Sequence, residues 1–192
     1  MERNTYRIIL ASNSPRRRQL LAGLDVDFEV RLLQDIDESY PSDLPAHDVA
    51  EYIAVKKADA YRATITENEL VITADTVVIS HDEVLGKPAD ATDAKRMLTM
   101  LSGNTHHVVT GVCLTTTHEQ KHFSVLTAVT FDTLSTEEID YYISHYKPFD
   151  KAGAYGIQEW IGYIGVSKLE GSYFNVMGLP VQRIYRELLN FK

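Results

Sequence analysis

Seven residues near the start of the chain combine hydroxyl, amide and guanidinium groups where a helix is expected to begin. They are Ser12-Asn13-Ser14-Pro15-Arg16-Arg17-Arg18. Ser14 followed by Pro15 is typical of an N-cap and a first helical position. Backbone N–H groups in the first turn of a helix attract anions, and three arginines there oppose the helix macrodipole unless an anion is bound. The pattern predicts a polyphosphate-binding turn; the alternative is that the arginines simply face solvent.

A single carboxylate interrupts an apolar, β-branched segment, residues 70–79, which is typical of a central strand covered on both faces. Aspartate is unfavourable inside a strand, and a buried carboxylate without a partner costs several kcal/mol. We therefore expect Asp75 to meet a cation or to face an open site. Aspartate can bind Mg²⁺ or Mn²⁺ or act as a general base. The alternative is an aspartate that a neighbouring turn satisfies.

Three further charged residues are weaker candidates. Lys87 lies between Gly86 and Pro88, which form a rigid turn that would aim its ammonium group. Glu38 and Lys57 show no local pattern beyond their charge, so a solvent-exposed position is the default for both.

One histidine motif suggests a different chemistry. Residues 118–122, HEQKH, match the HExxH pattern of zinc hydrolases, which works only where both histidines share one face of a helix. The motif lies in an expected turn between two strands, so a zinc hydrolase acting through His118 and His122 is the weakest hypothesis. His106 and His107 are expected on a strand, one at its surface and one in the core.

Composition excludes several classes of protein. The 192 residues are 44% hydrophobic and 24% charged, as in soluble globular chains. The net charge of −8 disfavours a general nucleic-acid binder. Cys113 is the only cysteine, which excludes an intrachain disulfide and favours a reducing, cytoplasmic setting; we expect it to be a core residue. No apolar run approaches the length of a membrane span.

Alternating patterns of strand and helix position these residues. Strands are expected over residues 6–11, 70–79, 105–117 and 121–132, and a strand plus loop over 25–45. Helices are expected from Pro15 to about residue 24, over 46–63, 90–102 and 135–146, and from 180 to 191. Residues 150–178 hold six of the ten glycines among several aromatic residues. The class is therefore α/β with a mixed sheet.

Seven short motifs are SNSPRR, IDE, ADTVV, LGKP, HVVTG, DKAGAYGIQ and GSYFNVMGLP. Together and in this order, from residue 12 to about residue 180, they resemble the Maf family of nucleoside triphosphate pyrophosphatases. The motif DKAGAYGIQ resembles the corresponding motif of the branch of this family that acts on dTTP and UTP. The resemblance implies a single Maf-like domain over residues 1–192. It also implies an inosine-triphosphatase-like fold, an elongated mixed sheet flanked by helices in two lobes with a central cleft, and a homodimer.

The resemblance also implies roles for individual residues. Asp75 becomes the proton acceptor that activates water, and Glu38 and Asp75 become ligands of a divalent cation, Mg²⁺ or Mn²⁺. The positions at which this branch sets its substrate preference are Arg16, Thr76 and Gln158. The positions that contact phosphates are Ser12, Arg17, Lys57 and Lys87. Two departures from the family pattern are Asn13, where a small residue is usual, and Glu159-Trp160, where a glycine is commoner.

The leading hypothesis is a metal-dependent, cytoplasmic enzyme of nucleotide house-cleaning. It would hydrolyse dTTP, UTP or their modified forms to the nucleoside monophosphate and pyrophosphate, without binding nucleic acid or a membrane. One alternative keeps this chemistry but acts on 7-methyl-GTP or other modified nucleotides. Another is a nucleotide-binding regulator of cell division that has no meaningful turnover.

Overall fold

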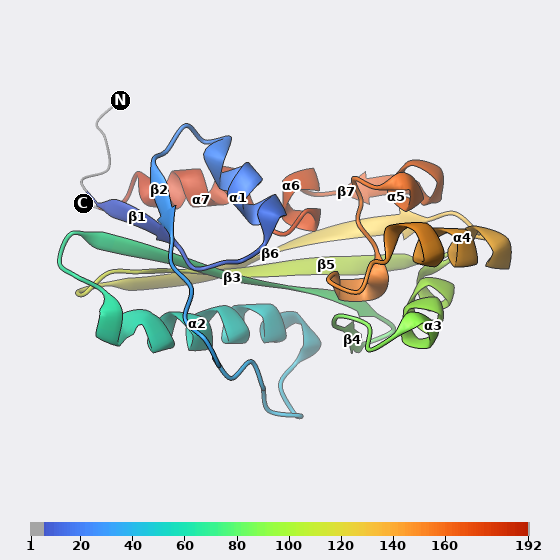
Figure 1. Ribbon diagram of the computed structural model, residues 1–192, viewed down its shortest axis with the longest axis horizontal. Coiled ribbons are helices and arrows are strands. Elements are labelled where there is room, and N and C mark those ends of the chain that lie inside the picture. Colours follow the sequence, from blue (N-terminus) through green and yellow to red (C-terminus); the bar gives the residue numbers. More distant parts are fainter. Residues whose placement is uncertain (1–5, 192) are drawn as a thin grey trace. The chain divides into compact units, whose positions relative to one another are not determined.

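The computed structural model describes residues 6–191, in which helices alternate with the strands of one mixed sheet (Figure 1). The seven strands of this part of the chain are β1 (Arg7–Leu10), β2 (Phe28–Val30), β3 (Glu69–Ser80), β4 (Glu83–Leu85), β5 (Thr105–Thr115), β6 (Gln120–Phe131) and β7 (Val166–Glu170). Their order is β2-β1-β3-β5-β6-β7, and β4 pairs with β3. β1 runs parallel to β2 and β3, whereas β4 and β7 run antiparallel to their neighbours. The predicted mixed sheet is confirmed.

Backbone contacts divide the chain into two compact units, as the expected two lobes require. The first unit holds the described residues up to Asp75, residues 110–125 and the residues from Gly178 onward. The second holds residues 76–109 and 126–177. The division falls within β3, between Asp75 and Thr76.

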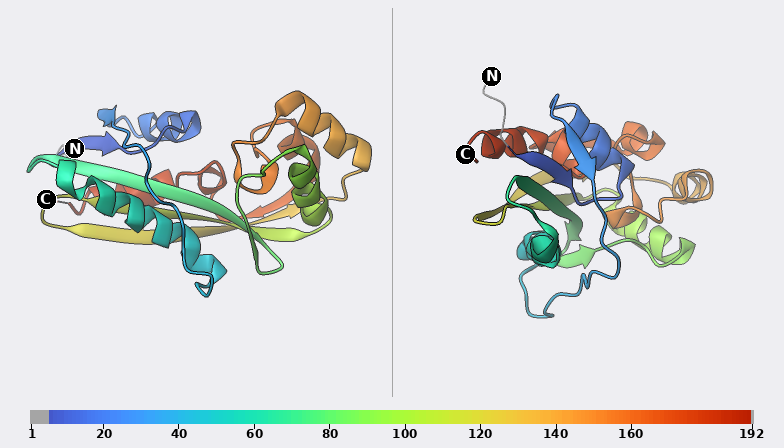
Figure 2. Two further views of the ribbon diagram at one scale, coloured as in Figure 1. Left: turned by 60° about the horizontal axis from the view of Figure 1, so that its bottom comes forward. Right: turned by 60° about the vertical axis from the view of Figure 1, so that its left-hand side comes forward.

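In the first unit, three helices cover the strands. α1 (Pro15–Ala22) and α7 (Val181–Leu188) lie on one side and α2 (Val49–Tyr61) on the other (Figures 1 and 2). α1 begins as predicted, with Pro15 at the first position and Ser14 Oγ accepting a hydrogen bond from Arg17 N. One turn of 3-10 helix precedes α2 and another follows it, so the helix predicted over 46–63 is confirmed.

Cys113 lies in the core of the first unit, packed with Ala54 and Ala58 of α2. It is fully buried, and burial raises the pKa of its thiol to about 11. The thiol therefore stays protonated and behaves as a small apolar residue, which confirms the prediction from its strand context.

The second unit packs its helices around a second core. α3 (Ala91–Leu101) begins at the N-cap Asp90, and α4 (Thr136–Tyr146) begins with the predicted capping box of Ser135 and Glu138. The glycine-rich segment after α4 contains a turn of 3-10 helix (Ala152–Ala154) and three short elements that the sequence analysis did not predict. These are α5 (Trp160–Gly165), β7 and α6 (Tyr173–Val176).

Among residues 6–191, no helix is both long and apolar enough to cross a lipid bilayer.

His106 is a buried, neutral histidine in the second unit. Its Nε2 lies 2.7 Å from Tyr155 Oη, and its ring makes edge contacts with Phe131 and Tyr155. Burial lowers the pKa of His106 from 6.5 to about 4. Between these pH values the unfolded chain binds a proton that the folded protein does not. The contribution of His106 to stability is therefore complete above pH 6.5 and is lost as the pH falls toward 4.

As the pH falls from 6.5 to 4, we expect the titration of His106 to lower the free energy of unfolding by about 3 kcal/mol. Chemical denaturation at several pH values gives the free energy of unfolding as a function of pH. Between pH 4 and 6.5 this free energy should change less with pH in His106→Gln than in the unchanged protein. The control is His118→Gln, because the His118 side chain is 73% exposed. Equal slopes for the His106 variant and the unchanged protein would contradict the assignment.

Candidate functional site

Two carboxylates and one ammonium group meet in the first unit and form what we call the carboxylate–lysine cluster: Glu38, Lys57 and Asp75. Lys57 Nζ lies 2.7 Å from Asp75 Oδ1 and 3.0 Å from Glu38 Oε1. The side chains of Lys57 and Asp75 are 13% and 17% exposed, whereas that of Glu38 is 54% exposed. The cluster is thus shielded at its base and open to solvent on the Glu38 side.

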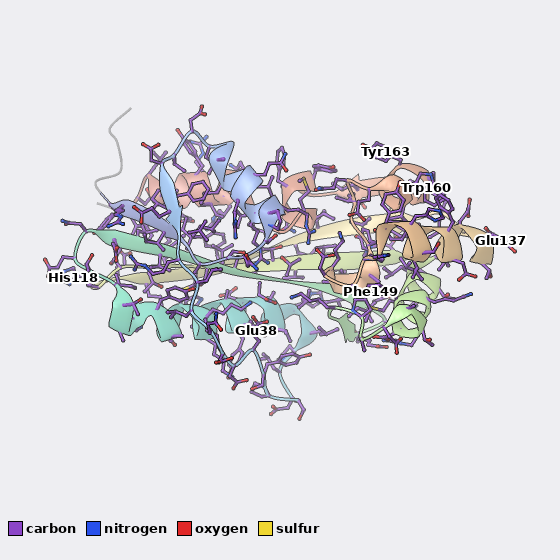
Figure 3. The ribbon with its side chains drawn as sticks, viewed as in Figure 1. Glu38, His118, Glu137, Phe149, Trp160 and Tyr163 are labelled. Atoms are coloured by element: carbon purple, nitrogen blue, oxygen red, sulfur yellow. The ribbon has the colours of Figure 1, made fainter. Side chains whose placement is uncertain are left out.

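Each member of the cluster comes from a different element. Asp75 lies in β3, where only positions 75 and 76 interrupt an otherwise buried strand. Lys57 lies on α2, and Glu38 lies on the loop that follows β2 and crosses α2 (Figure 3). The expectation that Asp75 meets a cation is confirmed. The expected solvent-exposed position is confirmed for Glu38 and is wrong for Lys57, whose side chain is 13% exposed and pairs with both carboxylates.

A second lysine fixes that loop. Lys56 Nζ donates to Asp37 Oδ2 (2.7 Å), to Ser39 O (2.8 Å) and to Ser39 Oγ (3.1 Å). Ser39 N donates in turn to Asp37 Oδ1 at 2.9 Å. The hydrogen bond from Lys56 is the main reason that the pKa of Asp37 lies well below its ordinary value. Asp37 and Ser39, the neighbours of Glu38, are therefore both anchored to Lys56 on α2.

Arg17 connects α1 to the strand that carries Asp75. Its Nη1 donates to Ala74 O at 2.7 Å, and its Nε donates to Gly178 O at 2.8 Å. Burial lowers the pKa of Arg17 from its ordinary value, and the charge of Asp75 acts in the opposite direction. Since a guanidinium group stays protonated even so, a buried positive charge lies beside Asp75.

The other residues of the first turn are arranged more locally. Ser12 is buried, and its Oγ accepts a hydrogen bond from Ser14 N at 3.2 Å. Arg18 Nη2 donates to Asn13 Oδ1 at 2.8 Å, and Arg16 is half-buried in the first turn of α1. The three arginines do not all face solvent, because Arg17 points inward.

The carboxylate–lysine cluster fits a divalent cation of the Mg²⁺ type. Mg²⁺ is usually held by one or two protein carboxylates, with water and substrate phosphates as the remaining ligands. Glu38 and Asp75 supply two carboxylates that already face one positive charge. Within residues 6–191, no group of three or more His, Cys, Asp or Glu side chains is arranged to hold a metal ion. Two carboxylates are the number that a Mg²⁺ site of this kind needs from the protein.

The second unit carries the other predicted residues, Thr76, Lys87 and Gln158. Lys87 is exposed on the turn after β4, and Gly86 O in that turn accepts a hydrogen bond from Gly153 N at 3.1 Å. Gln158 lies in the loop before α5, and its Oε1 is buried without a hydrogen-bond partner among the described residues. A buried acceptor without a donor is rare in proteins, so this oxygen is a candidate ligand contact.

The two histidines of the HExxH motif lie on a β-hairpin, as predicted, and not on a helix. His118 lies in the turn between β5 and β6 (Figure 3), and its Nε2 is 3.9 Å from Glu67 Oε1. His122 lies on β6, and its Nδ1 is 2.6 Å from Glu51 Oε1. Each histidine faces a different carboxylate, so the two do not converge.

Sequence reasoning missed the residues that support the site. Asp37 and Ser39 form an Asp-x-Ser turn, which is a recognisable local pattern, but nothing local shows that Lys56 closes it. Tyr142, Lys151 and Glu159 surround the loop of Gln158, and no local sequence pattern predicts these contacts.

The family model of Maf-like proteins matches residues 7–191. A dTTP/UTP pyrophosphatase of Phocaeicola vulgatus is 61% identical over 183 residues, which are 95% of this chain and 95% of the relative. A dTTP/UTP pyrophosphatase of Parabacteroides distasonis is 58% identical over 186 residues, which are 97% of this chain and 96% of the relative.

One solved structure is also similar, with a much lower sequence identity. The nucleoside-triphosphatase / dITP/XTP pyrophosphatase of Mycobacterium abscessus aligns with 73% of this chain and 94% of that chain, at 14% identity and a TM-score of 0.41. The family match over nearly all described residues and the two close relatives are sufficient: the chain belongs to the Maf-like protein family.

Proposed function

We propose that this protein is a nucleoside triphosphate pyrophosphatase that hydrolyses dTTP and UTP to the nucleoside monophosphate and pyrophosphate. The observation that carries the proposal is the carboxylate–lysine cluster, in which Asp75 and Glu38 share Lys57 Nζ. Relatives that are 58–61% identical over at least 95% of this chain bear the name of that activity and support it.

Asp75 is assigned as the general base. Lys57 donates to Asp75 Oδ1, which orients the carboxylate so that Oδ2 accepts a proton from the attacking water. The water oxygen bonds to the α-phosphorus, the bond to the bridging oxygen breaks, and the pyrophosphate leaves with the electron pair. A positioned base contributes about 10²- to 10⁴-fold to such a step.

Cationic and hydroxyl groups are assigned to the phosphates. Charge that builds up on the leaving pyrophosphate is stabilised by fixed positive groups. Arg17 is held in place by its bonds to two backbone carbonyls, so its position is set before substrate binds. The remaining phosphate contacts are assigned to Ser12, Lys57 and Lys87.

Glu38 and Asp75 are assigned to a divalent cation, Mg²⁺ or Mn²⁺. When bound, such an ion neutralises phosphate oxygens and lowers the pKa of a coordinated water. Lys56, Asp37 and Ser39 hold the Glu38 loop against α2, so that Glu38 is oriented before the ion arrives.

The base preference is assigned to Gln158, together with Arg16 and Thr76. Thymine and uracil carry an N–H donor at ring position 3 beside carbonyl acceptors, and a glutamine amide can match both with its oxygen and its NH₂ group. The buried Gln158 Oε1 is an acceptor that awaits a donor. Cytosine offers an acceptor at ring position 3, so it would leave this oxygen unpaired.

A panel of triphosphates tests the function. Purified protein is incubated with dTTP, UTP, CTP, dATP, GTP and 7-methyl-GTP, with Mg²⁺, with Mn²⁺ or with EDTA, and the released pyrophosphate and monophosphate are measured. We expect rapid release from dTTP and UTP, little from the other four, and none with EDTA.

Other outcomes separate the alternatives. Release confined to 7-methyl-GTP would keep the reaction and reject the role of Gln158. Tight nucleotide binding without release would favour a regulator that does not turn substrate over. The homodimer, the cytoplasmic location and the single domain stay predictions.

A further inference from the structure

Gln158 lies in a tight turn formed by residues 156–159, which we call the Gln158 turn. Gly156 O accepts a hydrogen bond from Glu159 N at 3.0 Å, which closes the turn with Gln158 in its third position. The Tyr142 hydroxyl, from α4, accepts from Gly156 N at 3.0 Å and donates to Glu159 Oε2. One hydroxyl group therefore joins the first residue of the turn to the last.

The Glu159 side chain contacts Tyr142 and Lys151 and does not cap α5. Glu159 is the N-cap residue of α5, but its side chain makes no capping hydrogen bond. Its Oε1 instead lies 3.1 Å from the ammonium group of Lys151, which is buried and also 2.7 Å from Asp150 Oδ1. The Gln158 turn is thus fixed from two sides, by a hydroxyl and by a buried cation.

The space around the turn is filled. A Cβ atom at Gly156 would lie 2.9 Å from Glu159 Cδ and 3.1 Å from Lys151 Cε. A Cβ atom at Gly162 in α5 would lie 1.9 Å from Ile157 O, so α5 packs directly on the backbone of the turn. α5 begins at Trp160, two residues after Gln158 (Figure 3). The backbone of the Gln158 turn therefore has little freedom to shift.

We propose that Tyr142, Glu159 and Lys151 are positioning residues that set the base preference by holding Gln158 in place. The inference rests on the proposed function, in which the Gln158 amide reads the base. A single amide distinguishes uracil from cytosine only if its oxygen stays within a fraction of an ångström of the position that the base requires. The discrimination is lost when the amide can turn and present its NH₂ group instead.

The protonation state of Tyr142 agrees with this role. Burial raises the pKa of Tyr142 above its ordinary value, and the hydrogen bond to Glu159 raises it further. The hydroxyl therefore keeps its proton and serves as the donor to Glu159 across the working pH range.

Tyr142→Phe tests the proposal, because it removes the hydroxyl and keeps the ring. We expect the ratio of kcat/KM for UTP to kcat/KM for CTP to fall by at least about tenfold. Most of the change should come from a higher KM for UTP. The UTP/CTP ratio of Gln158→Ala gives the reference value for a complete loss of discrimination. The matched control is Tyr146→Phe. Tyr146 stacks on Tyr142 with ring centroids 5.1 Å apart, and its hydroxyl has no hydrogen-bond partner in residues 6–191.

Glu159→Gln is the second variant and needs no change in the core of α4. It keeps an acceptor for Tyr142 but removes the charge that faces Lys151, so the UTP/CTP ratio should fall less than in Tyr142→Phe. An unchanged ratio in both variants, or equal losses on UTP and CTP, overturns the inference and leaves these residues purely structural. If Tyr142→Phe does not fold, the Glu159→Gln ratio decides by itself. An unmodified protein that releases no pyrophosphate overturns the proposed function and the inference together.

Discussion

Replacing Asp75 with asparagine is expected to lower kcat for UTP by about 10²- to 10⁴-fold, the range that a positioned general base supplies. Asparagine has the same shape but cannot accept the proton of the attacking water, and it is a poor ligand for Mg²⁺. Lys57 would keep an oxygen acceptor at position 75 and its ion pair with Glu38, so the fold should survive. Steady-state release of pyrophosphate measures the loss, and thermal unfolding checks the fold.

The control for Asp75→Asn is the same change at Asp43, which is exposed in the loop before α2. Asp43→Asn should retain both the rate and the midpoint of thermal unfolding. Calorimetric titration with UTP in the absence of a divalent ion separates binding from chemistry, because the phosphate contacts remain in the variant. A rate for Asp75→Asn within a few-fold of the unchanged protein would remove Asp75 from the role of base.

The sequence alone locates those parts of the fold that carry strong local patterns. Ser14-Pro15 and the Ser135–Glu138 capping box mark the starts of α1 and α4 because caps act within a single turn. The apolar run of β3 identifies a buried strand because neighbours cover both of its faces. By contrast, α5 and α6 are six and four residues long, which is too short for hydrophobic periodicity to appear.

In the candidate site, too, the sequence predicts some residues and not others. Asp75 can be found from sequence because a carboxylate in an apolar strand demands a partner. The sequence does not identify Lys57 as its partner, because Lys57 is 18 residues away and meets Asp75 only after α2 packs onto the sheet. Tyr142 is hidden for a different reason: its spacing on α4 is that of any core residue, and its hydroxyl matters only because the Gln158 turn closes around it.

The packing of α2 against β5 leads to the second large effect. At Gly111 in β5, a Cβ atom would lie 2.3 Å from Ala50 C, Ala50 O and Glu51 N, all backbone atoms of the first turn of α2. Backbone cannot rotate aside as a side chain does, so strand and helix must separate. We expect Gly111→Ala to lower the free energy of unfolding by about 3 kcal/mol or more, and the unfolding midpoint by several degrees. Chemical and thermal denaturation measure both quantities.

Gly86→Ala is the control for stability, because a Cβ atom there meets nothing within 4 Å; its unfolding midpoint should not change. Gly111→Ala should also lose turnover at temperatures where it is still folded, although residue 111 contributes no chemical group. The reason is that α2 carries Lys57, whose Nζ lies within 3.0 Å of both Asp75 and Glu38. A shift of the helix by a fraction of an ångström would loosen both contacts. A Gly111→Ala protein as stable and as active as Gly86→Ala would mean that α2 can move without loss, and that the cluster does not depend on this contact.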